Sequence, residues 1–193
     1  MASPPEPERV AVPLERAYRL INPGPLLLIS THDGERANVC TIAWNMPLSR
    51  SPALVLLAMD PGHKTHSNIL RTGVLGINVP TADQVELVRY FGSCSGHDVD
   101  KVAERGLGLY EGGAIAGLPL LRDAAAWLEC RRTEATGLAD HDLVLAQVVA
   151  AWARPGVLDA EGCWNSARFP TLHHAGGSRF MQGTPWTGPA NTG

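Results

Sequence analysis

Four side chains that could hold a ligand fall within one β-like stretch, Arg36 to Pro47. Asn38, Thr41 and Asn45 carry short hydrogen-bonding groups, and Trp44 adds a flat apolar ring with one N–H donor. This mixture of side chains would suit a planar ligand with polar edges, and it would equally suit an ordinary strand of a β-barrel. The stretch by itself leaves both interpretations open.

Side chains of an extended segment point alternately to its two faces. One face should carry Val39, Thr41 and Ala43, and the other Asn38, Cys40, Ile42 and Trp44. Because Pro47 has no N–H for a ladder hydrogen bond, we expect the strand to end there. We expect Asn38 and Trp44 to face a ligand and Val39 and Ala43 to pack the barrel, while Cys40 and Ile42 stay unassigned.

A phosphate-bearing ligand would need a cation and several donors that converge on one pocket, since its charge must be balanced once water is excluded. The best candidates are Lys64-Thr65 at an expected helix start, Ser93 to Gly96 just past another helix, and Lys101. Each has a plain alternative, as a solvated surface lysine or a simple loop. The usual nucleotide fingerprints GxGxxG and GxxxxGK[ST] are absent.

Histidines do not form a metal pattern. Metal ligation needs three or four ligands in one geometry, and the adjacent His173 and His174 would point opposite ways on an extended segment. We therefore expect no metal. His141, between two aspartates at a strand start, could be a proton donor whose pKa a carboxylate raises, or a surface turn residue. There is no GxSxG elbow, so a nucleophilic hydrolase fits poorly.

Positioning these residues requires several strands with short helices between them. We expect strands over residues 26–31, 53–59, 74–79, 125–133 and 142–152, besides the stretch described above. We expect helices over residues 13–20, 63–71 and 97–105, and one that follows a capping box of Thr81 with Gln84 and carries an apolar stripe of Val85, Val88 and Phe91. Long crossover connections are lacking, so the fold class is mainly β, an antiparallel barrel with short helices. A doubly wound parallel sheet is the weaker alternative.

Composition excludes several function classes. Sixteen Lys and Arg against nineteen Asp and Glu give a formal charge of -3, and the basic residues are scattered, so no nucleic-acid partner is indicated. No apolar run reaches the about 20 residues that span a bilayer, and no secretion signal is evident, so we expect a soluble, cytoplasmic protein. The four cysteines form no CxxC pair, which favours free thiols.

The chain should hold one folded domain. We expect a disordered lead-in over residues 1–12, the domain over residues 13–182 and a flexible tail over residues 183–193, because the two ends are rich in Pro, Glu or Gly with little to bury.

Taken together, the motifs resemble the flavin reductase-like FMN-binding split-barrel family, and within it the flavoredoxins. The resemblance covers about residues 15–182. It is carried by Asn38 to Trp44 (AN-x-x-T-x-AW), Ser51-Pro52, His63 to Ile69, Gly76 to Val79, Ser93 through Lys101, and the terminal His173-His174-x-Gly176-Gly177-x-x-Phe180.

The resemblance implies a six-stranded antiparallel split barrel that forms a homodimer and holds FMN noncovalently near the dimer interface. NADH or NADPH would donate electrons, and free flavin, ferric complexes or a protein would accept them. The implied cofactor-binding residues are Asn38, Thr41, Trp44, Asn45, Lys64, Thr65, Ser93, Lys101, His174 and Phe180, with His141 as the catalytic residue beside the isoalloxazine.

One departure from the family is visible, because members often have Tyr where Phe180 stands. Cys40 would lie close to redox chemistry if a flavin bound this face, or it is a buried structural cysteine. Two other functions stay open: an FMN electron carrier reduced by a partner protein, and a split barrel that has lost flavin and binds another ligand.

Overall fold

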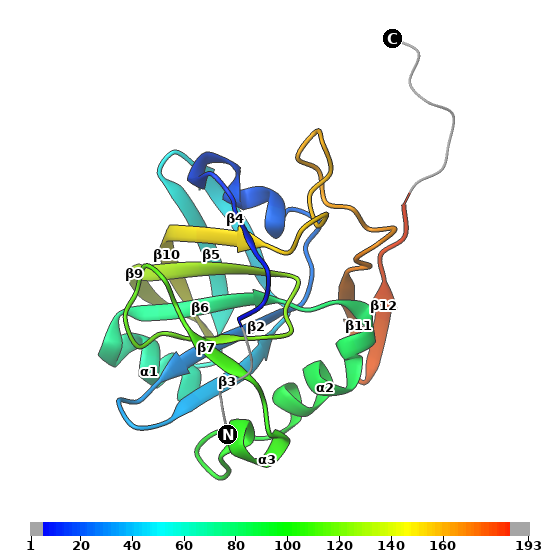
Figure 1. Cartoon of the computed structure of the whole chain (residues 1–193). Helices are drawn as coiled ribbons and strands as arrows, with labels where there is room; N and C mark the ends of the chain where they lie inside the picture. The colour runs from blue at the N-terminus through cyan, green and yellow to red at the C-terminus, as the bar shows by residue number, and fades with distance from the viewer. Residues whose placement is uncertain (1–5, 186–193) are drawn as a thin grey trace.

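One curled antiparallel sheet forms the body of the protein in the computed structural model, which describes residues 6–185 (Figure 1). Its strands follow the order β3-β2-β6-β9-β10-β5-β4, and β1 pairs with β10. They are β1 (Val10–Ala11), β2 (Leu27–His32), β3 (Ala37–Ile42), β4 (Asn45–Arg50), β5 (Ala53–Met59), β6 (Val74–Val79), β9 (Ala126–Leu138) and β10 (His141–Ala153). The path has two ends, β3 and β4, so the barrel is split, which confirms the expected fold class. The sheet has eight strands among the described residues, where six were expected.

Short elements cover the barrel. They are the 3₁₀ helices η1 (Leu14–Leu20) and η2 (Ala82–Gln84), the helices α1 (Lys64–Thr72), α2 (Val85–Ser93) and α3 (Lys101–Arg105), and the hairpins β7 (Leu109–Glu111) with β8 (Pro119–Leu121) and β11 (Leu172–Gly176) with β12 (Arg179–Gln182). The capping box of Thr81 and Gln84 is present and leads through η2 into α2. The helix expected over residues 97–105 is shorter than predicted, because the Asp100 side chain accepts the Ala103 N–H and caps α3 there.

Two apolar clusters lie on opposite faces of the central strands. The cluster inside the barrel includes Leu27, Cys40 and Ile42, and the outer one, which α2 covers, includes Leu28 and Val39. The prediction that Val39 packs the barrel is therefore wrong. Both faces of β3 are buried, so the alternation could not tell which face points inward. Ala43 does not pack the barrel either, since it lies exposed beyond the end of β3.

The stretch Arg36 to Pro47 is two strands. β3 ends at Ile42, and after a short break β4 pairs with β5 on the other side of the split. Pro47 lies inside β4, where we expected a strand to end. β4 is an edge strand of this sheet, so the missing N–H of Pro47 need not cost a ladder hydrogen bond. Consequently Trp44 and Asn45 do not continue the face that Asn38 presents.

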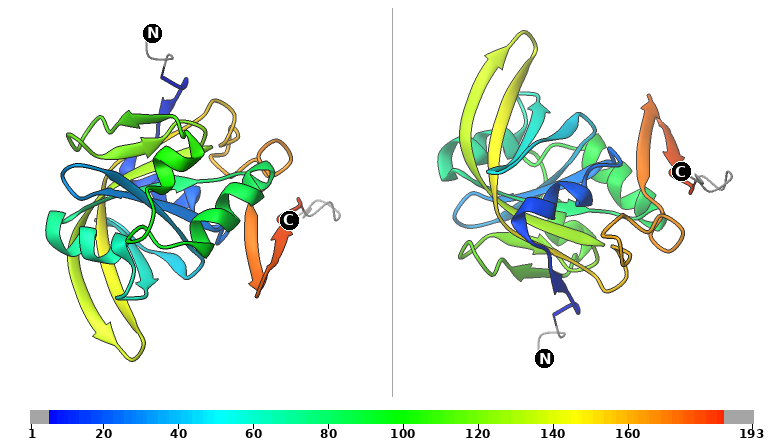
Figure 2. Two further views of the ribbon diagram at one scale, coloured as in Figure 1. Left: turned by 90° about the horizontal axis from the view of Figure 1, so that it is seen from below. Right: turned by 90° about the horizontal axis from the view of Figure 1, so that it is seen from above.

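A long hairpin projects from the barrel. β9 pairs with β6 only over Ala126 to Arg131, and the rest of β9 pairs with β10 alone. Figure 2 shows this yellow-green arm extending beyond the other strands. The arm carries His141 and Asp142 at the start of β10.

The ends of the domain differ in part from the expectation. Within the expected disordered lead-in, Val10–Ala11 pair with β10 through their backbone, although both residues are exposed, and Val12 is buried in the core of the barrel. Residues 1–5 and 186–193, which hold most of the expected tail, lie outside the described residues. In the part of the chain that is described, no helix is long and apolar enough to cross a membrane.

Candidate functional site

The start of α1 is an open helix end. A turn at Asp60-Pro61-Gly62, in which the Asp60 carboxylate accepts the Gly62 N–H at 2.7 Å, directs the chain into the helix. His63 occupies the N-cap position, and no side chain caps the helix there. The first backbone N–H groups of a helix have no partner within it, so this end attracts anions.

A small polar cavity lies in front of this helix end. Its walls come from β3, the start of α1, the end of α2, the loop that follows α2, and α3. Of the predicted site residues, the cavity is lined by Asn38, Thr41, Lys64, Thr65 and Lys101. Its volume is about 50 Å³, which suits a compact group better than a ring system.

Lys101 supplies a buried positive charge to the polar cavity. Its side chain is only 3% exposed, and Nζ donates to the carbonyl oxygens of Cys94 at 3.1 Å and Phe91 at 3.4 Å. Burial lowers the pKa of Lys101, while the neighbouring Cys40 and Cys94 act against that change. None of the ion pairs within residues 6–185 includes Lys101. Since an ammonium has three donors, one N–H remains for a ligand.

Asn38 and Thr65 meet across the cavity wall. The Asn38 Nδ2 donates to Thr65 Oγ1 at 2.7 Å, and both residues are buried. Cys40 lies beside them, and burial raises the pKa of its thiol to about 11, so it is a neutral thiol near pH 7. Gly96 closes the cavity from the loop after α2, and a Cβ at this position would overlap the Asn38 amide.

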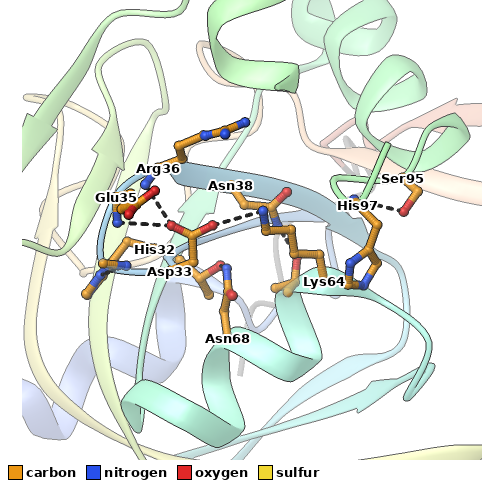
Figure 3. Close-up of polar contacts among 12 residues, drawn as sticks. His32, Asp33, Glu35, Arg36, Asn38, Lys64, Asn68, Ser95 and His97 are labelled. Atoms are coloured by element: carbon orange, nitrogen blue, oxygen red, sulfur yellow. Dashed lines mark hydrogen bonds and ion pairs between the residues drawn. The ribbon is translucent and has the colours of Figure 1, made fainter. Parts of the chain in front are cut away.

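Lys64 forms an ion pair with Asp33. Figure 3 shows its side chain reaching Asp33 in the β2–β3 turn, with Nζ 2.9 Å from Oδ2. The backbone N–H groups of Arg36 and Glu35 also donate to Asp33. The Arg36 N–H and then Lys64 hold the pKa of Asp33 well below its usual range. Lys64 thus lines the polar cavity with its charge already balanced.

A larger apolar cavity of about 360 Å³ adjoins the polar one, because Thr41 and Gly92 line both. The β11–β12 hairpin and α2 form its walls, and three further predicted residues, Ser93, His174 and Phe180, line it. The rings of His174 and Phe180 lie 5.7 Å apart, and His174 Nε2 is 2.9 Å from the Gly177 carbonyl oxygen.

Two of the predicted hydroxyl ligands bond within the chain. Thr41 Oγ1 donates to the Val88 carbonyl at 2.6 Å and so ties α2 to β3. Ser93 Oγ donates to the Tyr90 carbonyl at 3.0 Å, and Ser93 is the last residue of α2. Both side chains border the cavities, but these contacts also give them a structural role.

Three predicted residues lie outside both cavities. Trp44 is 62% exposed and contacts His141, with ring centroids 4.7 Å apart. The His141 Nδ1 lies 3.1 Å from the Asp140 carboxylate, as its position between two aspartates suggested. Asn45 donates to the Pro25 carbonyl at 2.9 Å. Trp44 and Asn45 lie apart from Asn38 because the chain breaks between β3 and β4, and His141 lies at the start of β10.

Sequence reasoning missed several residues at the site. His63 was not among the predicted site residues, although its place directly before Lys64-Thr65 was a usable signal. Arg89, which lines the apolar cavity, gave no local signal, whereas Gly96 lies in the predicted segment Ser93 to Gly96 and lines the polar cavity. Within residues 6–185, no group of three or more His, Cys, Asp or Glu could hold a metal ion.

The model of the flavin reductase like domain matches residues 18–180. The chain belongs to the flavin reductase like domain family. This match covers the barrel, both cavities and the β11–β12 hairpin up to Phe180, and it confirms the family expected from the motifs.

Relatives agree with this membership along most of their length. YddH of Escherichia coli (strain K12) is 34% identical over 178 residues, which cover 89% of this chain and 93% of YddH. The NADH-dependent FMN reductase AsuE2 of Streptomyces nodosus subsp. asukaensis is 31% identical over 83% of this chain and 80% of AsuE2.

Solved structures of the family share the fold. An FMN-binding domain of a flavin reductase-like enzyme from Shewanella baltica OS155 superposes with a TM-score of 0.84 and 29% identity, covering 96% of this chain and all of that chain. The flavoredoxin of Desulfovibrio vulgaris (Miyazaki F) has a TM-score of 0.76 at 20% identity, covers 88% of this chain and 91% of its own, and supports the fold alone.

Proposed function

We propose that this flavin reductase family member binds FMN noncovalently and reduces it with a nicotinamide nucleotide. The observation that carries the proposal is Lys101, a buried ammonium without a carboxylate partner that keeps one donor for the polar cavity. Burying an unbalanced charge is costly, so a fold that keeps one at a cavity wall is suited to an anionic ligand.

The polar cavity fits the phosphate group of FMN. Lys101 would donate to a phosphate oxygen, the Thr65 hydroxyl lies beside it, and the first N–H groups of α1 face the same space. Asn38 would orient Thr65 through their hydrogen bond. Gly96 leaves room that a side chain would fill. Lys64 would add less, because Asp33 already balances its charge.

The ring end of the flavin needs an apolar surface, and two regions offer one. His174 and Phe180 line the apolar cavity, which adjoins the polar cavity at Thr41, and Trp44 with His141 forms an exposed aromatic pair. Bound FMN would supply hydride acceptance and one-electron transfer. The protein would exclude water and orient the ring, with His141 as the residue that holds a proton close to it.

NADH is the donor that we favour, because the relative AsuE2 is described as NADH-dependent. Free flavin is the acceptor that we favour for the same reason, with ferric complexes or a protein as alternatives. An FMN carrier that a partner protein reduces is the second candidate function. The carrier is less well supported, because it would need no nicotinamide site. The apolar cavity of about 360 Å³ beside the polar cavity leaves room for a nicotinamide ring besides the flavin.

The decisive experiment titrates purified protein with FMN and follows flavin fluorescence and absorption, and then measures NADH and NADPH oxidation with excess FMN. We expect saturable FMN binding and faster oxidation of NADH. Absence of FMN binding would overturn the proposal. FMN binding without oxidation of either nucleotide would favour the carrier.

We also propose that the protein is a homodimer that joins through the β4 edge and the β9–β10 arm. Trp44, Met46, Leu48 and Leu138 are all about half exposed or more, at 62%, 49%, 48% and 62%. Such exposed apolar groups on an edge strand and a projecting hairpin are suited to an interface. Light scattering should give the mass of two chains, and Leu48→Lys should lower that mass toward the mass of one chain.

The expected cytoplasmic location stays a prediction.

A further inference from the structure

The charge balance of the polar cavity is incomplete without a further group. A phosphate monoester carries a charge of about −1.5 to −2 near pH 7. Lys101 contributes one positive charge, whereas the charge of Lys64 is already balanced by Asp33 at 2.9 Å. The open end of α1 adds only a partial positive charge, equivalent to about half an elementary charge. Up to about half an elementary charge of a bound dianion is therefore left unbalanced, which a further cation at the cavity wall would neutralise.

His63 is the titratable side chain placed to supply that cation. It lines the polar cavity from the N-cap position of α1, directly before Lys64 and Thr65. Its backbone is fixed, since its N–H donates to the Asp60 carbonyl and its carbonyl accepts the Ser67 N–H. No hydrogen bond or ion pair of its imidazole is found within residues 6–185, so the ring is free to bind a ligand.

The surroundings of His63 disfavour its protonated form in the ligand-free protein. Desolvation is the main cause that lowers the pKa of His63, and Lys101, His141 and His66 lower it further while Asp60 raises it. The two other histidines have acidic partners of their own, because His66 lies 2.8 Å from Asp142 and His141 lies 3.1 Å from Asp140. Asp60 is thus the acidic group that acts on His63 directly.

We propose that His63 is a proton-linked phosphate ligand, which takes up one proton as the phosphate monoester of FMN enters the polar cavity. This inference rests on the proposed function. The proton goes from solvent to the imidazole, and the imidazolium then faces the phosphate together with Lys101. Because the bound anion favours the protonated ring, binding raises the pKa of His63. The contribution of His63 to FMN affinity is present below that raised pKa and is lost as the pH rises through it.

Calorimetry of FMN binding at about pH 7.5, in buffers of different ionisation enthalpy, counts the protons taken up. At this pH the phosphate is largely dianionic already, since its second pKa is about 6. We expect wild type to take up a substantial fraction of one proton and His63→Gln to take up none. Riboflavin, which lacks the phosphate, should bind without proton uptake to either protein.

The pH profile gives a second readout. Between about pH 6 and pH 8 the FMN dissociation constant of wild type should rise roughly tenfold relative to that of His63→Gln, because each pKa unit gained on binding is worth a factor of about 10 in affinity. His97→Gln is the matched control, since His97 lies on the neighbouring loop without lining the cavity, and it should behave as wild type.

The outcomes separate the two proposals. Equal proton uptake by wild type and His63→Gln, or none by wild type, would overturn the role of His63 and leave the FMN site standing. Failure of wild type to bind FMN at any pH would overturn the proposed function and this inference with it. His63 is exposed, so loss of folding in His63→Gln is not expected, and circular dichroism checks it.

Discussion

Lys101 and Glu129 are both buried and charged, and the protein satisfies them differently. The Glu129 carboxylate is fully buried on β9 and accepts three backbone N–H groups, from Gly113 at 2.6 Å, Ala114 at 2.9 Å and Ile115 at 2.6 Å. Gly112 allows the loop to approach, since a Cβ there would lie 2.7 Å from the carboxylate carbon. Lys101 has two carbonyl acceptors and faces a cavity.

The difference separates a structural charge from a binding charge. Glu129 lines neither the polar nor the apolar cavity, and the loop around it supplies enough donors to replace water. Lys101 keeps one N–H unused beside a small polar cavity, so its last partner must come from outside the chain. Both residues are buried, so burial alone does not distinguish them. The difference is that Lys101 has an unused N–H that faces a cavity, whereas Glu129 accepts hydrogen bonds from its own loop. The predictions that follow test this distinction.

Glu129→Ala should cause the largest loss of stability. Three N–H groups would lose their acceptor, one of them buried and two partly buried, and each unsatisfied buried donor costs about 1–3 kcal/mol, so the free energy of unfolding should fall by about 3–5 kcal/mol. Urea denaturation measures this change. The folded fraction of Glu129→Ala should bind FMN with the affinity of wild type. Glu129→Gln keeps one acceptor oxygen, so its free energy of unfolding should fall by less than that of Glu129→Ala. A loss below about 1 kcal/mol would remove the structural role given to Glu129.

Lys101→Met should have the opposite profile. The alkyl packing is largely kept, but a charge-assisted hydrogen bond worth about 1.5–3 kcal/mol is lost, so the FMN dissociation constant should rise by roughly 10- to 100-fold. The free energy of unfolding should change by less than about 1 kcal/mol, since removing a buried charge offsets the lost hydrogen bonds. Lys64→Met is the control and should weaken binding less. Unchanged FMN affinity in Lys101→Met would contradict the assignment of the binding charge.

Gly96→Ala should weaken FMN binding by an intermediate amount, roughly tenfold, because the added methyl group would displace the Asn38 amide and with it Thr65. Fluorescence titration of the single and double variants with Asn38→Ala tests this cause. In the Asn38→Ala background the added methyl group should cost little. An equal loss in both backgrounds would show that Asn38 does not transmit the effect.

Asp33→Asn should have the smallest effect, and it concerns pH. The pKa of Asp33 is held below its usual range, chiefly by the Arg36 N–H and then by Lys64. Its stabilising contribution is therefore complete above its unfolded pKa of about 3.9 and is lost as the pH falls toward its folded pKa. The unfolding free energy of Asp33→Asn should depend less on pH below about 4 than that of wild type. Urea denaturation across this range measures it, and identical slopes would exclude Asp33 as the cause.

Local patterns in the sequence predicted the parts of the site that depend on neighbouring residues. Lys64 and Thr65 lie at a helix start as expected, and Lys101 and Thr65 do line the same cavity. The strand over residues 74–79 and the capping box at Thr81 also follow from short-range signals. In these cases the turn and capping chemistry lies within a few residues of the side chain that it positions.

Long-range contacts account for what the sequence could not predict. Trp44 was assigned to the strand of Asn38, because nothing local shows that β4 pairs with β5 instead. Lys64 has a partner in Asp33 that is distant in the chain, and the two carbonyls that hold Lys101 depend on how α2 ends. The orientation of β3 was misjudged because both its faces are buried. Partners that only tertiary packing supplies leave no local pattern.

The projecting β9–β10 arm has a consequence for isotope exchange. Arg132 is the last residue of β9 whose N–H is bonded on the β6 side, to the Gly73 carbonyl at 2.8 Å, so from Thr133 onward β9 pairs with β10 alone (Figure 2). In an isolated chain these amides should exchange with deuterium sooner than those of Ala126 to Arg131, because little surrounding structure resists local opening. A second chain packed against the arm would slow that exchange, so deuterium uptake measured on peptides from residues 133–138 would report assembly.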